Sequence, residues 1–562
     1  MSHIASHAAK KGGFISGPHL SLDKVLVVAS ILIPLVCLLL FFGYPLYIVL
    51  IRSLTLPDGT LGLVNYAQVF SNATLVSATL NSLVLSAMTM LISLLLGFAI
   101  AYRLERTSAK GRAFVTVALA LPLLAPSLVQ GLGLIFIFGR NGLINQWFGI
   151  SINPYGFYGL LMANILYALP QVVLIIQAAL RQSDARLYEA AGVMGATNWE
   201  KFRDITLPNA KFGLISAGFV AFTVTITDFG NAAVIGGDFR VLATEIYNQV
   251  AGQMNFSMGA VVGILLLIPT VVAVGVERFA ARKQSASASE SAIPVQPDTN
   301  TWRDVLLGAL THSCSAMIYL VIGVTVFASF VDLWPYRMEL TLRHYNISMA
   351  GGYTPLWMSL WISLLAASLG VVLIFLMAVS MKKLPAQIGR IVNFIAIMPV
   401  GVPGLVLGLA YILAFNTGGP LTLLYGTPLL IGLCNLYHYH SQGFLTMMTG
   451  LRGVPVSLED TCTCFGGGMK ETLRDAVFPF MLTTCIAVFF FLFMRSMVSL
   501  SAVIFLITPS INVAPVAIMQ LSDAGRISEA AAFSTCLMLL VVTAMLLLRW
   551  LIKKVPSPDK RS

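Results

Sequence analysis

The sequence predicts an all-α polytopic membrane protein with about twelve transmembrane helices, each needing about 20 apolar residues. Of its 562 residues, 57% are hydrophobic and only 10% are charged, whereas a soluble protein carries about 25% charged residues. No soluble core could bury so much apolar surface, so lipid must be the main solvent. Backbone groups in lipid have to bond within their own segment, and the apolar runs are therefore expected to be helices.

The apolar runs fall into two sets of six. The predicted spans cover residues 25–51, 79–102, 113–138, 157–180, 210–235 and 258–277, and then 304–330, 356–381, 391–415, 428–449, 480–506 and 529–551. The third run contains Pro122 and Pro126, which a membrane helix tolerates when neighbouring helices satisfy the freed carbonyls. The pattern predicts a first permeation domain over 25–278 and a second over 304–551, with tails at 1–24 and 552–562.

The second set of runs repeats the first. Pro399 stands as far after Pro122 in the sequence as Pro403 stands after Pro126. Such a fixed offset is the signature of an internal repeat. Residues 279–303 separate the halves, are rich in Ser, Ala and Pro, and have no apolar period. They are expected to form a flexible linker.

The net charge of +11 could indicate a nucleic-acid partner, but its distribution favours a membrane topology instead. Lys and Arg gather in short loops that alternate with loops poor in both, as the positive-inside rule describes. Both halves have the same orientation on this basis, with both termini and the linker in the cytoplasm; this is a parallel repeat. The basic clusters are Arg103, Arg106, Lys110 and Arg112; Arg278, Arg282 and Lys283; Lys382, Lys383 and Arg390; and Lys553, Lys554, Lys560 and Arg561.

Two polar segments of matching layout interrupt the apolar chain, at residues 189–208 and 460–479. When their final prolines, Pro208 and Pro479, are aligned, Gly466 corresponds to Gly195; this alignment is called the repeat register below. Glycine permits positive φ, so a tight turn between two short helices is expected in each copy. Proline then suits the first turn of the span that follows. The layout predicts a pair of polar docking surfaces on the cytoplasmic side.

The first segment carries a recognisable pattern, E-A-A-x3-G-x9-I-x-L-P. It resembles the signature loop of the permease subunits of bacterial ABC importers, which have the type I (MetI-like) helical fold. The resemblance implies that each loop is a coupling helix seated in a cleft of an ATPase subunit. The second copy departs from the pattern, with Asp460, Thr461 and Cys462 in place of E-A-A, and is expected to be the weaker dock. The implied coupling residues are Glu189, Ala190, Ala191, Gly192, Gly195, Ile205, Leu207 and Pro208, and then Glu459, Asp460, Gly466 and Pro479.

Fused permeases of this length are similar to those of ferric-iron importers and of 2-aminoethylphosphonate importers. Five stretches look most like the aminoethylphosphonate branch: residues 121–128, 255–269, 402–412, 500–509 and 521–532. The resemblance implies import of a small anionic or zwitterionic solute by ATP-driven alternating access. The first expectation for the solute is 2-aminoethylphosphonate, and the alternative is ferric iron.

The sequence contains no recognisable ATP-binding site. The glycine-rich stretch at 466–470 lacks the Gly-Lys pair of a phosphate-binding loop. The resemblance therefore implies separate ATPase subunits, a homodimer that binds ATP and Mg²⁺, and a periplasmic binding protein that delivers the solute. No catalytic cluster or metal site is predicted, and the chain itself needs no cofactor. Two rival classes are an ion-coupled secondary transporter, which needs intramembrane acids, and a membrane enzyme.

Four residues are candidates for the translocation pathway: Asp228, Arg495, Ser499 and Asn81. The repeat register aligns Asp228 with Ser499, one helical turn beyond Arg495. An ionisable side chain at membrane depth costs about 2.5–3.5 kcal/mol and usually faces a partner or a cavity. Asp228 and Arg495 are expected to pair with each other; alternatively, they meet the ammonium and phosphonate ends of a zwitterion.

His438 and His440 lie within the tenth run. Their alternate spacing places them on different faces of a helix, so they are not expected to share one metal ion. Polar contacts between helices are the favoured interpretation for both.

Overall fold

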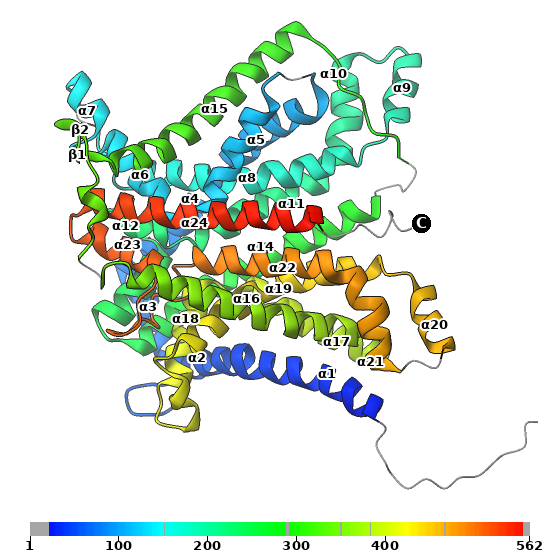
Figure 1. The fold of residues 1–562 in the computed structure, drawn as a ribbon. Coiled ribbons are helices and arrows are strands. Elements are labelled where there is room, and N and C mark those ends of the chain that lie inside the picture. Colours follow the sequence, from blue (N-terminus) through cyan, green and yellow to red (C-terminus); the bar gives the residue numbers. More distant parts are fainter. Residues whose placement is uncertain are drawn as a thin grey trace, which may run out of the picture.

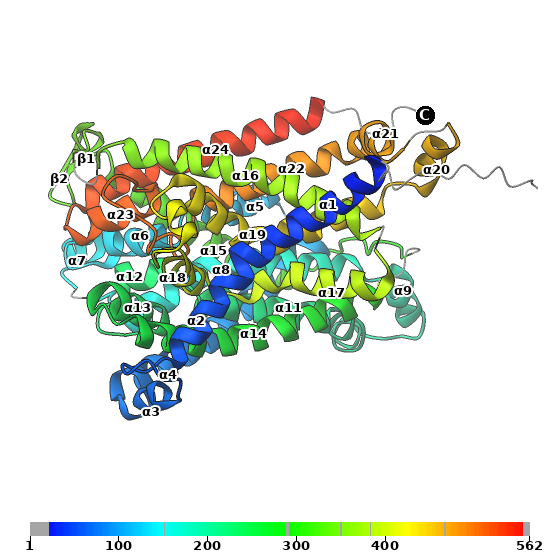
Figure 2. The same cartoon turned by 90° about the horizontal axis from the view of Figure 1, so that it is seen from below.

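The computed structural model describes residues 22–108, 110–150, 152–287, 292–348, 351–382, 384–465 and 468–554. Long helices run between two opposite faces of the molecule (Figures 1 and 2). One end, here called the α9 face, carries α9 (Ala185–Val193) and α20 (Val456–Cys464). The other end, the hairpin face, carries α7 (Leu143–Phe148) and the two-stranded antiparallel sheet of β1 (Val331–Leu333) and β2 (Arg337–Leu340).

Each half is built on four long helices that pack side by side. In the first half they are α4 (Ala73–Arg106), α8 (Phe157–Arg181), α11 (Leu207–Ile226) and α14 (Phe256–Ser287). In the second they are α16 (Thr354–Met381), α19 (Pro428–Arg452), α22 (Phe478–Met497) and α24 (Ile527–Lys554). Shorter helices on the hairpin side are α3 (Val64–Ser71), α12 (Gly230–Ile235), α13 (Leu242–Tyr247) and α23 (Ala514–Asp523).

The halves repeat one another down to single hydrogen bonds. Ser82 on α4 accepts a bond from the backbone N–H of Leu242 at 2.7 Å. Ser359, its counterpart on α16, accepts one from the N–H of Ala514, also at 2.7 Å. Each serine thereby fixes the start of a short helix, α13 in one half and α23 in the other.

The third predicted run is not one continuous helix. It consists of α5 (Arg112–Ala120), the 3-10 turn Leu121–Leu124 and α6 (Leu128–Phe138), with Ala125 in an extended conformation. The equivalent run of the second half, α17 (Ala386–Ile397), Met398–Gly401 and α18 (Gly404–Phe415), is bent by 105°. The break falls at the second proline of each run, Pro126 or Pro403, because proline disfavours the helical conformation of the residue before it; Ala125 and Val402 are both extended.

The first helix of each half packs against the other half. The helices α1 (Leu22–Leu38) and α2 (Tyr44–Leu54) contact α16 and α18, and α15 (Thr301–Ala328) contacts α4, α5 and α6. Tyr411 of α18 donates a hydrogen bond to the carbonyl of Phe41 at 2.6 Å. One continuous core of buried residues extends through both halves, so they form a single interlocked body.

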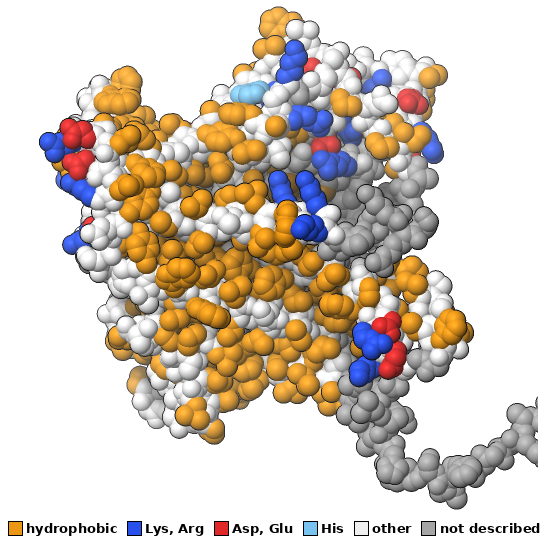
Figure 3. All heavy atoms as spheres, in the orientation of Figure 1, with side chains coloured by type: hydrophobic (Ala, Val, Ile, Leu, Met, Phe, Trp, Pro, Cys, Tyr) orange, Lys and Arg blue, Asp and Glu red, His pale blue; other side chains and the backbone are white. Residues whose placement is uncertain are grey.

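The outer surface between the two faces is apolar. Figure 3 shows hydrophobic side chains over this band, with charged side chains gathered towards the two ends. Leu95, Trp361 and Leu539 are 74%, 70% and 67% exposed there. Large apolar side chains in contact with the solvent are expected where that solvent is lipid, and the band identifies the surface that faces the membrane.

The described residues contain ten helices that are long and apolar enough to cross a membrane, or eleven if the bent pair α17–α18 counts as one span. The sequence predicted about twelve, at about 20 residues each. The helix outside this count is α19, which has 25 residues. Its buried Asn435, His440 and Ser441 lower its hydropathy, because this helix lies inside the bundle rather than against lipid.

The segment between the halves differs from the expected flexible linker. Residues 292–300 lie along the α9 face and are held there by backbone hydrogen bonds. The N–H of Ala185 donates to the carbonyl of Ile293 at 2.9 Å, and the N–H of Asp298 donates to the carbonyl of Arg106 at 3.2 Å. Arg303 then forms an ion pair with Asp298 at 2.7 Å. This strap, residues 292–300, ties the start of α15 to the start of α9.

Candidate functional site

The first repeat segment, residues 189–208, forms a short helix, a turn and a second short helix on the α9 face (Figure 1). The turn is made at Gly195, whose φ of +81° suits glycine. The second helix, α10 (Asn198–Lys201), begins with a capping box. In that box the N–H of Thr197 donates to Glu200 at 2.7 Å, and the N–H of Glu200 donates back to Thr197 at 3.3 Å. These bonds lower the pKa of the exposed Glu200 carboxyl.

The segment is attached rigidly to the bundle by aromatic side chains. Phe202 packs edge-on against Phe98 and Tyr102 of α4, with ring centroids 5.9 and 5.8 Å away. Tyr188 of α9 shares a hydrogen bond with Thr206 at 3.0 Å, and its ring lies under the guanidinium of Arg106 at 5.4 Å. A force applied to α9 would therefore reach α4 and α11 directly.

The second repeat segment, residues 460–479, has the same layout but a different cap. It contains the end of α20, α21 (Met469–Glu471) and the π-helical turn Thr472–Val477. Here the N–H of Gly468 donates to Glu471 at 3.0 Å. Gly466, the predicted turn residue, lies outside the described residues. Arg474 and Asp475 pair at 2.7 Å, as Arg203 and Asp204 do in the first segment.

Most of the predicted coupling residues face solvent. Glu189, Ala190, Gly192, Gly195, Pro208, Asp460 and Pro479 are exposed, Ile205, Leu207 and Glu459 are half-buried, and Ala191 is buried. Glu459 is paired with Lys382 at 2.6 Å.

Sequence reasoning missed the apolar tips of the two segments. Met194 is 80% exposed, and Phe465, its equivalent in the repeat register, is 89% exposed. Val193 and Trp199 are 91% and 65% exposed beside Met194. Large apolar side chains on a polar face mark an interaction surface. The signal in the sequence was an apolar residue directly before the glycine in both copies.

A second candidate site is a polar cavity of about 100 Å³ between the halves. It lies at the ends of α11 and α22 that point away from the α9 face; each helix has 20 residues and spans roughly 30 Å. The first half contributes Ser127, Tyr167, Gln171, Thr227 and Asp228, and the second contributes His438, Tyr439, Arg495, Ser499 and Ser501. We call this the central cavity.

The predicted ion pair between Asp228 and Arg495 is not present among the described residues, although both side chains line the central cavity. The Asp228 carboxylate accepts the N–H of Asn231 at 3.1 Å, and Ser127 and Gly230 line the cavity with it. Arg495 lies over the ring of Tyr439, 4.9 Å from its centroid, and Tyr167 lines the same cavity from the first half. The pairing prediction was wrong: among the described residues each charge contacts neutral groups instead, Asp228 the backbone of Asn231 and Arg495 the ring of Tyr439.

The other polar residues singled out in the sequence lie in different places in the structure. Ser499 lines the central cavity, and its buried hydroxyl has no hydrogen-bond partner in the described structure. Asn81 lies elsewhere and donates to the carbonyl of Arg240 at 3.0 Å. His440 contacts the carbonyl of Ala396 at 3.2 Å, which is the interhelical role expected for it. His438 instead lines the cavity, with an Nδ1 that has no partner among the described residues.

The repeat also relates the walls of the central cavity. Tyr167 and His438 occupy equivalent positions in the repeat register. A Cβ added to Gly230 would lie 2.3 Å from the Ser127 hydroxyl, and a Cβ added to Gly404 would lie 2.3 Å from that of Ser501. In each half, a serine side chain therefore packs directly against the backbone of a glycine. The repeat register, applied to His438, would have found Tyr167.

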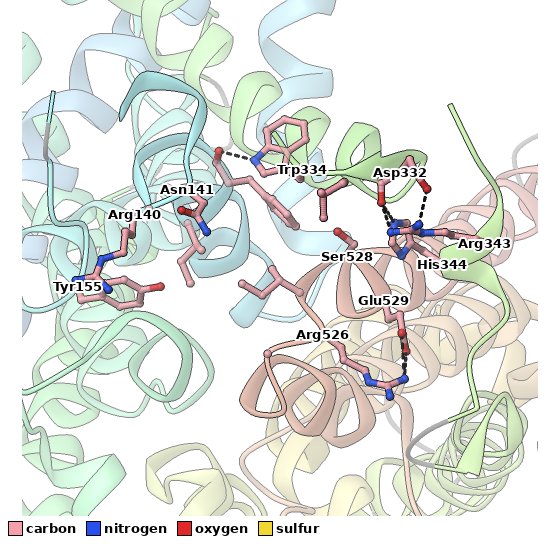
Figure 4. A pocket seen from close by; sticks show the side chains of 16 residues that line it. Arg140, Asn141, Tyr155, Asp332, Trp334, Arg343, His344, Arg526, Ser528 and Glu529 are labelled. Atoms are coloured by element: carbon pink, nitrogen blue, oxygen red, sulfur yellow. Dashed lines mark hydrogen bonds and ion pairs between the residues drawn. The ribbon is translucent and has the colours of Figure 1, made fainter. Parts of the chain in front are cut away.

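A third site opens on the hairpin face. It is a pocket of about 350 Å³ with walls from both halves. Figure 4 shows Arg140, Asn141 and Tyr155 on one side and residues from the second half on the other. Arg343 is held by Asp332 at 2.6 Å and Arg526 by Glu529 at 3.2 Å. The indole of Trp334 donates to the carbonyl of Phe136 at 3.1 Å and joins the two walls.

The chain is similar to known transport proteins. Residues 93–285 match the family described as "Binding-protein-dependent transport system inner membrane component". The chain is 25% identical over 560 residues to the ferric transport system permease protein FbpB of Actinobacillus pleuropneumoniae, covering 96% of this chain and 80% of that protein. It is 32% identical over 176 residues to the molybdenum transport system permease protein ModB of Azotobacter vinelandii, covering 30% of this chain and 78% of that protein.

A solved structure is also similar, that of a bacterial ABC transporter involved in the import of the acidic polysaccharide alginate. Its identity is 20% and its TM-score 0.39, and the match covers 47% of this chain and 96% of that one.

The long apolar helices and the sequence relatives define a polytopic permease, a transport component rather than a catalytic enzyme. The chain belongs to the family of binding-protein-dependent transport system inner membrane components, the permeases of ABC importers. Two relatives that align over most of the chain, at 96% and 87%, are named for ferric transport. Neither of these two is named for a phosphonate.

Proposed function

We propose that the two repeat segments are the docks for a pair of ATPase subunits and that the α9 face is cytoplasmic. The observation that carries this proposal is the presence of two such segments, built alike and equivalent in the repeat register, on one face of the molecule. Each presents an exposed apolar tip, Met194 or Phe465, with charged side chains beside it. The start of α1 and the end of α24 also lie towards this face (Figure 1), which supports a cytoplasmic location for both of these helix ends.

The movement follows from the way the docks are attached. ATP bound by a homodimeric partner would draw the two segments together, and hydrolysis would release them. Phe202 and Tyr188 would transmit that motion to α4 and α11, and the bundles would rock between inward-open and outward-open states. ATP and Mg²⁺ belong to the partner; this chain supplies the pathway.

The hairpin face is the proposed docking surface for the binding protein that the family's description mentions. Its pocket spans both halves, so a partner seated there would touch both bundles at once. Arg140 forms none of the ion pairs found in the described part of the chain, whereas Arg343 and Arg526 across the pocket are paired. Arg140 is therefore the cation best placed to meet an acidic side chain of the binding protein.

For the solute, the relatives aligned over most of the chain favour ferric iron over 2-aminoethylphosphonate. A specific observation keeps the second candidate: the central cavity is lined by Asp228 and Arg495, a negative and a positive charge that do not neutralise one another directly. A zwitterion carries the complementary pair. 2-Aminoethylphosphonate combines an oxyanion with a positive charge. Ferric iron does the same when it is transported together with a bound anion.

Uptake measured in cells tests the proposal. Cells that express the chain with its ATPase and binding protein should accumulate ⁵⁵Fe(III) or radiolabelled 2-aminoethylphosphonate, and an excess of the unlabelled true solute should abolish accumulation. An ATPase unable to hydrolyse ATP should stop uptake. Uptake that survives without the ATPase would identify an ion-coupled transporter and overturn the proposal.

A further inference from the structure

The central cavity holds more polar chemistry than a packing interface requires. Asp228 is 9% exposed and Ser499 is 4% exposed, and the Ser499 hydroxyl has no partner in the described structure. Buried polar groups in proteins are nearly always hydrogen-bonded, because leaving one unpaired costs the full loss of its hydration. Charges at membrane depth are rarer still and mark ion or solute pathways.

The arrangement of Arg495 leaves donors free. A guanidinium has five N–H groups, and here it lies over the Tyr439 ring, 4.9 Å from the ring centroid. This contact is with an aromatic ring and not with the carboxylate or phosphate oxygens that a guanidinium binds in pairs. Had the role of Arg495 been to neutralise Asp228, an ion pair between them would be the expected geometry; the two charges instead line one cavity from opposite halves.

The volume limits what the site holds in this state. A space of about 100 Å³ is below the roughly 300–1,000 Å³ of a pocket that takes a whole drug-sized ligand. That suits one oxyanion group, and a larger solute would enter as the halves move apart. The walls come from α8 and the α11–α12 junction on one side and from α19 and α22 on the other, so rocking of the bundles would open and close the site.

We propose that the central cavity is a transient recognition site for a solute that pairs an oxyanion with a positive charge. Arg495, with the Ser499 hydroxyl, contacts the oxyanion, and Asp228 favours the positively charged part. This inference rests on the proposed import function and names the residues that select the solute. The positive part is either an ammonium group, as in 2-aminoethylphosphonate, or a metal ion that accompanies the anion.

The test uses the assembled transporter and its measured uptake of each labelled solute. Arg495→Gln should lower uptake at least about tenfold, the scale of a lost charge-assisted hydrogen bond. Arg549→Gln removes a charge from an exposed position on α24 and should leave uptake unchanged. Uptake is expressed per complex that co-purifies with the ATPase, so a variant that fails to assemble is not counted as one that fails to select.

Asp228→Asn separates the two sources of positive charge. If the solute is 2-aminoethylphosphonate, this variant should discriminate less against ethylphosphonate, which lacks the amine, as a competitor of uptake. If the solute is iron, ⁵⁵Fe(III) uptake should fall while ethylphosphonate competes in neither protein. Arg495→Lys keeps the charge without the planar fork and should assemble fully yet transport poorly.

Two results would overturn the inference while leaving the import function intact. One is equal uptake per complex in Arg495→Gln and Arg549→Gln. The other is an Arg495→Lys variant with full uptake together with an Asp228→Asn variant whose uptake and competition profile match the wild type. Loss of ATP-dependent uptake in the wild type itself would instead refute the proposed function.

Discussion

Arg495 stacks on Tyr439, with its guanidinium carbon 4.9 Å from the ring centroid, and does not reach Asp228 as an ion-pair partner. A cation over an aromatic face is stabilised by the ring quadrupole, by about 0.5–2 kcal/mol depending on solvation. This contact holds a positive charge beside the central cavity without a carboxylate. The charge is therefore fixed in place but still able to bind an anion.

Replacing Tyr439 should show how much the ring contributes. Tyr439→Leu removes the aromatic face under Arg495 and should destabilise the protein by about 0.5–2 kcal/mol. Tyr439→Phe keeps the ring and should stay close to the wild type. The unfolding temperature of the purified permease in nanodiscs measures the difference. Equal losses in the two variants would mean that the hydroxyl, not the ring, holds Arg495.

Gly195→Asp should leave membrane insertion intact and abolish uptake. The residue turns at a φ of +81°, which strains any side chain, and the substitution adds a Cβ and a negative charge at the proposed dock. The matched control is Gly59→Asp on the loop after α2, where φ is +82° and a Cβ also meets nothing within 4 Å. The readouts are membrane abundance, co-purification of the ATPase, and uptake. Normal uptake in Gly195→Asp would count against the docking role.

The exposed tips Met194 and Phe465 offer a comparison of the two docks. Met194→Ser and Phe465→Ser each remove an apolar side chain that burial against a partner would stabilise by about 1.5–3 kcal/mol. Each should therefore weaken ATPase binding at least tenfold. Leu423→Ser, which alters a residue 86% exposed in the α18–α19 connection, serves as the control. Binding unchanged in both tip variants would place the ATPase elsewhere.

The capping box predicts a pH dependence in the first dock. The Thr197 N–H and hydroxyl lower the pKa of Glu200 from its ordinary value of 4.5. A carboxyl whose pKa is lowered by folding adds stability at pH values above 4.5, and that stability is lost as the pH falls through the folded-state pKa. Hydrogen exchange of residues 195–201 should therefore be slower at about pH 6 than below about pH 4, beyond the intrinsic pH effect. Glu200→Gln should lack this additional dependence, and an identical pH profile in both proteins would refute the assignment.

The internal duplication and the hydropathy of the sequence predicted different parts of the fold and of the candidate sites. Duplication predicted the two repeat segments well: the shared offset of glycine and proline indicated the turn that Gly195 makes. Duplication did not predict the contacts of Asp228 and Arg495. An offset shows which positions are equivalent, but not which neutral groups each charge contacts. Hydropathy located the third run and its equivalent at 391–415, yet it carries no information on chain direction, and the bend at Pro403 was missed.

The linker shows the same limit. Its composition predicted flexibility, since Ser, Ala and Pro bury little apolar surface. The strap is held instead by backbone hydrogen bonds, to which any sequence can contribute, and by Asp298 with Arg303. Composition does not reveal such bonds when the partner, Ala185, lies far away in the sequence and only the fold brings it close.

One substitution can weaken the attachment of that strap. Ala185 is the first residue of α9, a position that favours proline, and Asp184 before it is already extended, with φ −87° and ψ 127°, as a residue preceding proline must be. Ala185→Pro therefore keeps the helix while it removes the N–H that donates to Ile293. Protease cleavage within residues 292–300 should become severalfold faster. Ala190→Ser, a mild change on the exposed side of the same helix, should not alter the cleavage rate. If Ala185→Pro is cleaved no faster than the wild type, the strap is held by the contacts of Asp298 with Arg106 and Arg303.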